Sequence, residues 1–205
     1  MWIIQVNDYI EFSLVGGRFL PFPLLFYLCT EPQKNKNIMM TVTVEERHLI
    51  EEIIAKNTVC YVGMIDLNGF PYVIPMNFGY KDDVIYLHSA QEGSSINALA
   101  KNPEVCITFC TEPVLTFQNE SVACSYRMKG ASVICRGKVV FEEDYEEKIK
   151  ALDIIMKQYT ERAFTYSEPS VHNVRVWKIE IEDISTKVFG VPHPNSRNYK
   201  DKLEF

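Results

Sequence analysis

The stretch GFPYVIPMNFGY, residues 69–80, decides the fold expected for this chain. β-Branched and aromatic residues dominate it, which is typical of a β-strand. Pro71 and Pro75 each remove a backbone donor from the strand's hydrogen-bond ladder, so the strand must lie at the edge of a sheet or carry a bulge. Its free backbone groups are suited to hydrogen bonds with a planar ligand.

The segments on either side of this stretch predict an α+β domain. Asn68-Gly69 indicates a type I′ hairpin turn, and Lys81-Asp82-Asp83 a second turn. Thr43 to Glu46 has the spacing of a capping box and predicts a helix start. These signals indicate an antiparallel barrel of six or seven strands with three helices between them. The expected strands are 59–67, 70–80, 84–89, 105–110, 131–141, 174–181 and 184–188; the expected helices are one ending near Asn57, 94–101 and 142–159.

Composition narrows the functional classes. The 205 residues include 21 Lys and Arg against 27 Asp and Glu, and the net charge of −6 argues against a general nucleic-acid binder. No Gly-x-Gly-x-x-Gly or Walker loop is present, which argues against a Rossmann or P-loop nucleotide site. The six cysteines form no Cys-x-x-Cys pair or zinc-ligand spacing, so we expect buried, reduced thiols, no metal and a cytoplasmic protein.

The two ends of the chain differ from the middle. We divide the chain into an N-terminal extension (1–38), a main domain (39–190) and a tail (191–205). The apolar run 19–29 is too short to span a bilayer and lacks the flanks of a signal peptide, so no membrane association is expected. Two interpretations of the extension stay open: translation begins at Met39 or Met40, or the extension is an arm that packs on the domain or a partner.

Three ordered motifs resemble those of the pyridoxamine 5′-phosphate oxidase-related flavoproteins. The first is residues 69–80, similar to the family's G-x-PY-x-x-P-x-x-F-x-Y strand. The second is the segment 85–93, IYLHSAQEG, followed by Asn-Pro-x-Val-Cys at 102–106, and the third is SVICRGKV at 132–139. The strand-end His-Ser-Ala resembles most closely the subgroup of 5-nitroimidazole resistance proteins. The resemblance covers roughly residues 42–190.

The resemblance implies an FMN-binding split β-barrel that forms a homodimer, with the flavin bound where the two subunits meet. A small-molecule substrate would reach the flavin there. The residues matched to the family's cofactor site are Ile74, Pro75, Met76, Asn77, Phe78, His88, Ser89, Ala90, Gly93, Ser94, Ser95, Ser132 and Val133.

The chain departs from the family where the cofactor phosphate is expected. The family's Gly-Arg-Lys is replaced by Gly93-Ser94-Ser95, and Ala131 stands where an arginine would precede Ser132. Serine hydroxyls and helix amides can still bind an anion, but two charge-assisted bonds are lost. Either Arg127, Lys129 or Arg136 compensates, or FMN binds weakly, or FAD is preferred.

The leading hypothesis is a flavin-dependent oxidoreductase that resembles nitroimidazole reductases and passes electrons to a small aromatic acceptor. The resemblance places His88 at the active site, where it would donate a proton to a reduced nitro group or orient the substrate. On general grounds a lone strand-end histidine is also a common structural residue. The alternatives are a non-catalytic flavin-binding protein and a pyridoxamine phosphate oxidase-like enzyme.

Overall fold

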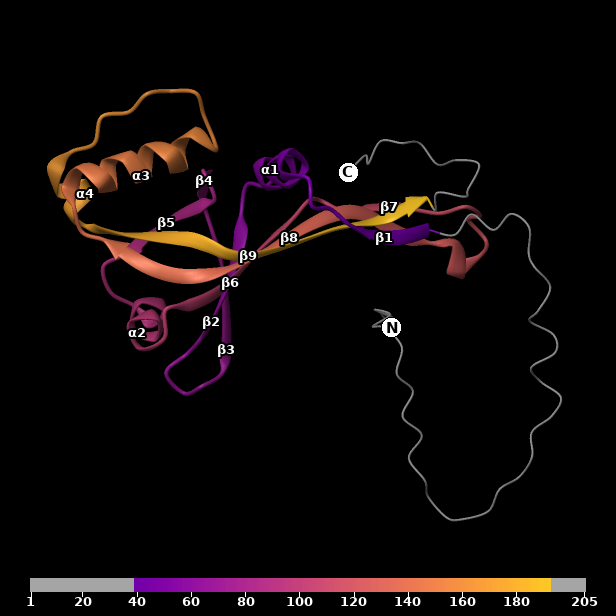
Figure 1. Ribbon diagram of the computed structural model, residues 1–205, viewed down its shortest axis with the longest axis horizontal. Coiled ribbons are helices and arrows are strands. Elements are labelled where there is room, and N and C mark those ends of the chain that lie inside the picture. Colours follow the sequence, from indigo (N-terminus) through magenta and orange to yellow (C-terminus); the bar gives the residue numbers. More distant parts are fainter. Residues whose placement is uncertain (1–38, 193–205) are drawn as a thin grey trace, which may run out of the picture. The chain divides into compact units, whose positions relative to one another are not determined.

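A computed structural model describes residues 39–192 of the chain (Figure 1). This range contains nine strands, four α-helices and one 3-10 helix, Ala123–Ser125. The strands are β1 (Met39–Thr43), β2 (Cys60–Ile65), β3 (Pro71–Met76), β4 (Gly79–Lys81), β5 (Val84–Ala90), β6 (Glu104–Cys110), β7 (Val114–Thr116), β8 (Arg127–Glu142) and β9 (Val174–Pro192). The helices are α1 (Arg47–Ala55), α2 (Ser94–Lys101), α3 (Tyr145–Lys157) and α4 (Glu168–His172).

All strand pairs are antiparallel, and the sheet has the order β3-β2-β6-β8-β9-β5-β4. β1 adds to β9 and β7 to β8. The two long strands β8 and β9 pair from Gly130 to Glu142 with one irregularity at Arg136/Gly137, so they form the centre of the sheet. The expected α+β split barrel is confirmed, with more strands than predicted.

β3 lies at an edge of the sheet, as the two prolines required. It pairs with β2 from Pro71 to Met76 and with no other strand of the described residues. The predicted strand 70–80 is divided in two, because Asn77 and Phe78 leave the ladder before β4 begins at Gly79. The predicted strands 174–181 and 184–188 are instead one strand, β9. The register with β8 shifts where Arg136 pairs with Asp183 and Gly137 with Ile181, but the strand continues through this irregularity.

Two local predictions are wrong. Thr43 does not cap a helix: it belongs to β1, and α1 starts after Glu46 without a side-chain cap. The turn at Asn68-Gly69 is not type I′, because only Gly69 has a positive φ (87°) and Asp66 accepts hydrogen bonds from the amides of Asn68 and Phe70. The hydrogen bonds accepted by the Asp66 carboxylate stabilise this different turn. The Asn-Gly dipeptide contains no information about Asp66, so it could not predict the turn type.

The second turn has the conformation that the first was expected to have. Asp82 and Asp83 both adopt positive φ (50° and 63°) between the paired residues Lys81 and Val84, as a type I′ turn requires. Asp83 holds the turn in place by accepting a hydrogen bond from Tyr80 (2.9 Å) and pairing with Arg47 of α1 (2.8 Å).

The helix α3 covers β4 and β5 (Figure 1). Its approach is close at Gly79, where a Cβ atom would lie 2.7 Å from the amide nitrogen of Ile155. Tyr159, just beyond α3, accepts a hydrogen bond from the amide of Phe78 and donates one to the carbonyl of Thr58, both at 2.9 Å. The end of α3 therefore fixes the junction between β3 and β4.

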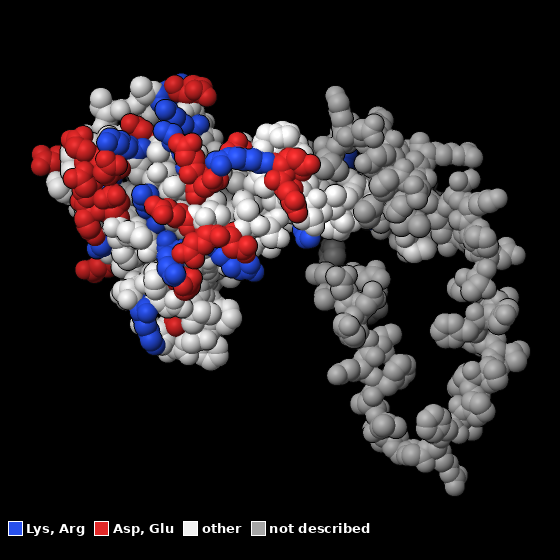
Figure 2. All heavy atoms as spheres, viewed as in Figure 1, with Lys and Arg blue, Asp and Glu red and all other residues white. Residues whose placement is uncertain are grey.

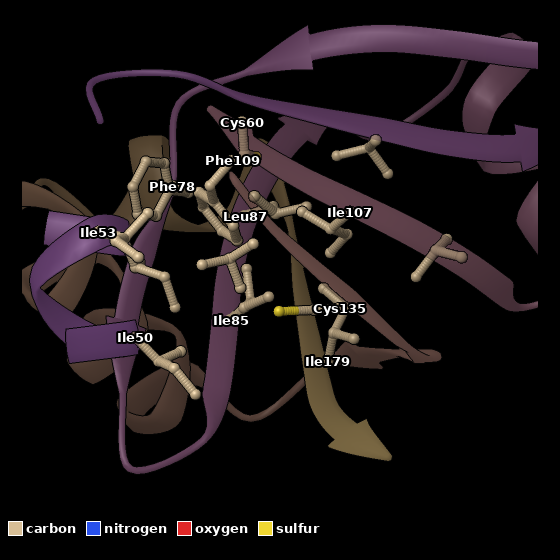
Figure 3. Close-up of a cluster of buried hydrophobic side chains, with 14 of the residues drawn as sticks. Ile50, Ile53, Cys60, Phe78, Ile85, Leu87, Ile107, Phe109, Cys135 and Ile179 are labelled. Atoms are coloured by element: carbon tan, nitrogen blue, oxygen red, sulfur yellow. The ribbon is translucent and has the colours of Figure 1, made fainter. Parts of the chain in front are cut away.

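The core includes buried side chains of the sheet and of the helices α1 and α2. Figure 3 shows the part of it that lies next to α1. The Phe78 ring meets the Phe109 ring edge-on, with 4.8 Å between centroids. The labelled side chains from α1 and from five strands point toward one another: Ile50, Ile53, Cys60, Ile85, Leu87, Ile107, Cys135 and Ile179. Trp177 and Val133 belong to the same buried cluster.

The cysteine prediction holds only in part. Cys60 and Cys135 are buried, and burial raises the pKa of each thiol to about 12. Cys106 is half-buried, whereas Cys110 at the end of β6 and Cys124 in the 3-10 helix are exposed. All five are free thiols, and Cys29 lies outside the described residues.

The domain division stays a prediction. Residues 1–38 and 193–205 lie outside the described part of the chain, and β9 continues to Pro192, slightly beyond the expected boundary at 190. Among residues 39–192 no helix has the length and apolar character needed to cross a membrane.

Candidate functional site

The β3 strand presents an open backbone edge. Backbone groups of alternate residues point to the same side of a strand, and β2 occupies one side of β3. The proline positions therefore lie on the other side, where the carbonyls of Pro71, Val73 and Pro75 and the amide of Val73 have no partner strand. Such a row of acceptors with one donor can bind the polar edge of a planar ring.

The predicted residues of this strand divide between the two faces. Pro75 and Asn77 are exposed, whereas Ile74 and Met76 pack against the core. Phe78 is fully buried, and its amide is already bonded to Tyr159, so it serves the core and has no free group for a ligand. Pro75 and Asn77 are therefore the two exposed side chains among these five.

At the end of β5, His88 and Ser89 point in opposite directions. His88 is exposed on the face away from the core, and partial desolvation by its surroundings lowers its pKa below 6.5. Ser89 turns inward, accepts a hydrogen bond from the buried Trp177 indole at 3.0 Å and donates one to the carbonyl of Ala90 at 2.8 Å. The Ser89 hydroxyl is therefore committed to the protein.

The helix α2 begins directly after this segment with free amides. Its first backbone bond runs from the amide of Asn97 to the carbonyl of Gly93 (3.0 Å), and Gly93 provides no side-chain cap. In the described residues the amides of Ser94, Ser95 and Ile96 have no acceptor, and a helix N-terminus favours an anion. Gly93 adopts φ 148° with nothing within 4 Å of a Cβ position, so the space before the helix is open.

Ser132 and Val133 lie in a different part of the sheet. Ser132 faces outward on β8, on the same face of the sheet as Pro75. Residues paired across neighbouring strands share a face, and Pro75 pairs with Tyr61, Tyr61 with Thr108, and Thr108 with Ile134. Ser132 lies two residues before Ile134 and therefore points to the same side. Val133 is fully buried and points into the core. Ser132 is therefore the member of this pair that a ligand can touch.

The structure does not bring all predicted residues together within one chain. On β9, His88 pairs with Val176 and Ser132 with Lys187. Eleven residues of strand span about 35 Å at roughly 3.3 Å per residue. The candidate site therefore consists of two separate groups, one around His88 and α2 and the other around Ser132 and the outer face of β8.

The three cations considered as replacements for the family's Arg-Lys differ in their engagement. Arg136 pairs with Asp183 at 2.6 Å, and Lys129 also has an interaction partner. Arg127 retains a buried Nε atom with no hydrogen-bond partner. Of the three, Arg127 is the one with a buried donor that no protein group satisfies.

The hydrogen-bonding groups of the candidate site are of the kinds that a flavin requires. The β3 edge offers donors and acceptors for the ring system, and the start of α2 offers amides for a phosphate. An open groove of about 380 Å³ between α3 and β4–β5 is lined by Tyr86, Lys150 and Asp153 among others, but by none of the predicted cofactor residues. The groove therefore does not contribute to this site.

Sequence reasoning missed two residues that shape the site. Tyr159 carries no local signal for such a role, yet its hydroxyl accepts a hydrogen bond from the amide of Phe78, just beyond β3. Gln91 had no signal at all, and its amide ties the segment after β5 to the start of β9. Both act through contacts between residues about eighty positions apart, which no local pattern records.

The antiparallel sheet with its open β3 edge and its helix start beyond β5 defines a split β-barrel protein. The family model described as pyridoxamine 5′-phosphate oxidase matches residues 46–188, and the chain belongs to this family. The match includes β3, the β5–α2 segment and all of β8. No curated protein sequence matches the chain.

Solved structures of other proteins are similar to this chain. One is a protein from Bacteroides thetaiotaomicron provisionally assigned to 5-nitroimidazole antibiotic resistance, with 51% identity over 74% of this chain and 89% of that one (TM-score 0.68). A flavocytochrome from Azotobacter vinelandii is 20% identical over 79% and 88% (TM-score 0.62). An FAD- and haem-binding protein from Mycobacterium smegmatis is 15% identical over 74% and 75% (TM-score 0.63). The last two show a shared fold.

Proposed function

We propose that the protein is a flavin-dependent oxidoreductase that passes electrons from a bound flavin to a small aromatic acceptor of the nitroimidazole class. The observation that carries this proposal is the 51% identity to the Bacteroides protein assigned to nitroimidazole resistance. The family match supports the flavin, and two proteins that share the fold carry flavin in their names.

The chain's own residues would hold the cofactor through backbone groups more than through charged side chains. The β3 edge at Val73 would bind the polar side of the ring system, and the amides of Ser94 and Ser95 would bind the phosphate. A bound flavin would supply the electron transfer. FMN is the expected cofactor, and FAD is the alternative because the family's two cations are absent.

His88 would act on the acceptor beside the ring. Its lowered pKa keeps the imidazole mostly neutral at pH 7, so it can donate a hydrogen bond through its N–H group and orient the substrate. As pH falls, the imidazolium form becomes available to donate a proton to the reduced nitro group. Its exposure on the outer face of β5 leaves it accessible to a small molecule.

A homodimer would unite the two groups of site residues. Tyr61, Ile65 and Val73 expose 50%, 41% and 61% of their surface on the outer face of β2 and β3, and Phe70 in the adjoining turn exposes 66%. Figure 2 shows charged side chains of both signs over the described face, with few near this hairpin. An apolar face beside an open strand edge favours association with a second copy.

The test is a spectrum followed by a turnover assay on the purified full chain. We expect a yellow protein whose released cofactor runs as FMN or FAD on chromatography. Under anaerobic conditions a reduced nicotinamide should bleach the flavin band, and a nitroimidazole should restore it. A yellow protein that neither bleaches nor recovers would support the non-catalytic flavin-binding alternative. A protein that stays colourless after flavin addition would overturn the proposal.

A further inference from the structure

Gln91 connects two parts of the chain that lie about eighty residues apart. It is half-buried in the short segment between β5 and α2. Its Nε2 donates hydrogen bonds to the carbonyl of His172 (2.7 Å) and to that of Val174 (2.9 Å). These two carbonyls mark the end of α4 and the first residue of β9, so Gln91 joins the loop to that junction.

The Val174 carbonyl is a point where three elements meet. Besides Gln91, it accepts a hydrogen bond from Lys148 Nζ (3.3 Å), which comes from α3. Lys148 is only 5% exposed, so this side chain of α3 is buried where it meets the start of β9. Removing Gln91 would leave the His172 carbonyl without this donor and reduce the partners of Val174, a cost that water only partly offsets.

The segment beyond Gln91 has little else to hold it. Ser89 is anchored to Trp177, but Glu92, Gly93 and Ser94 are exposed, and Gly93 adopts φ 148° with open space around it. Gln91 lies between the anchored Ser89 and the first helical bond of α2. It is therefore placed to determine where the helix start lies relative to His88.

We propose that Gln91 is a positioning residue, which sets the distance between His88 and the free amides of α2 by tying their connecting segment to the α4–β9 junction. The inference rests on the proposed flavin site, because these amides are the groups expected to bind the phosphate. Gln91 itself would not touch the cofactor. Its loss should release the segment and weaken flavin binding without altering any binding group.

The chain contains a matched control for this proposal. Gln158 Nε2 also donates to two backbone carbonyls, those of Ala55 (3.1 Å) and Asn57 (2.8 Å), and it too is half-buried. It ties the residue after α3 to the last residue of α1 and to the segment that follows α1. Gln91→Met and Gln158→Met therefore remove the same chemistry from two places. Gln91→Glu is a second variant, which keeps the shape but replaces the donors with acceptors and adds one negative charge.

The first measurement is amide hydrogen exchange of the full chain without flavin. In both Gln91 variants we expect exchange at Asn97, whose amide makes the first backbone bond of α2, to speed up about ten-fold, since two modest hydrogen bonds are lost. Gln158→Met should leave this amide at the wild-type rate. Wild-type exchange in both Gln91 variants, or equal acceleration in Gln158→Met, would overturn the proposal.

The second measurement is the dissociation constant for FMN by fluorescence titration. We expect it to rise about ten-fold in both Gln91 variants and to stay within about two-fold of wild type in Gln158→Met. An unchanged constant in Gln91→Met and Gln91→Glu would overturn the role in binding. If the wild type binds no flavin, the proposed function fails, and the exchange measurement still decides whether Gln91 positions the helix start.

Discussion

The buried indole of Trp177 donates a hydrogen bond from Nε1 to the hydroxyl of Ser89 at 3.0 Å. Trp177 is completely inaccessible to solvent, and Ser89 belongs to the segment that the family motif assigns to the cofactor. A residue expected to bind a ligand is thus bonded to the core. The core and the candidate site are linked through this pair, because the same hydroxyl donates to the carbonyl of Ala90.

Ser89→Ala should destabilise the fold. The substitution leaves the Trp177 N–H buried without an acceptor, which costs about 1–3 kcal/mol. Urea denaturation followed by tryptophan fluorescence would measure the loss. Ser121→Ala, at an exposed serine, is the control and should change the midpoint little. Equal stability of Ser89→Ala and wild type would show that the indole finds another partner.

Val73→Lys should convert the expected dimer into monomers. A lysine buried in an apolar contact without a partner costs several kcal/mol, so the dimer dissociation constant should rise at least about a hundred-fold. Val140→Lys is a matched control, because Val73 and Val140 are strand valines exposed to 61% and 62%. Sedimentation velocity at micromolar concentration measures the oligomeric state of both variants. A wild type that is monomeric with flavin bound would contradict the dimer itself.

Ser95→Lys should tighten FMN binding by restoring one of the missing cations. The expected gain is about 1–2 kcal/mol, or roughly five- to thirty-fold, and it should shrink with added salt. Ala100→Lys adds the same charge near the other end of α2 and should have a smaller effect. If the site is shaped for FAD, the lysine should weaken FAD binding while FMN gains. No change with either flavin at low salt would exclude Ser95 from the phosphate site.

His88 should make the protein less stable as the medium becomes acidic. Its pKa is lowered in the folded state, so below about pH 6.5 the unfolded chain binds a proton that the folded chain does not yet accept. Stability is therefore unaffected above the unfolded pKa and decreases as pH falls toward the folded pKa. The effect should be modest, because an exposed group is screened by solvent.

The measurement compares the urea midpoints of wild type and His88→Asn at pH 7.5 and pH 5.5. We expect His88→Asn to lose less stability between the two. In turnover assays the wild type should become faster as pH falls below about 6.5 if the imidazolium donates the proton, and His88→Asn should lack this dependence. Parallel pH profiles of the two proteins would assign His88 a purely structural role.

Local chemistry by itself determined several elements of this protein. The helix α2 occupies 94–101 as predicted, because Ile96 and Leu99 face the core and Pro103 follows its end. The edge position of β3 follows from Pro71 and Pro75, since a missing donor has the same consequence in any sheet. The turn at Asp82-Asp83 and the body of α3 were likewise predictable from short-range signals.

Tertiary structure alone decided which groups of the candidate site are free. Alternation along β5 separates His88 from Ser89, but only the position of Trp177 makes the inner hydroxyl a structural group. Thr43 has the spacing of a helix cap, yet pairing of β1 with β9 placed it in a strand. The separation of His88 from Ser132 by eleven residues of β9, and the bonds of Gln91 to His172 and Val174, arise from long-range pairing. Long-range pairing depends on the packing of the whole sheet, and residues close in the chain carry no record of it.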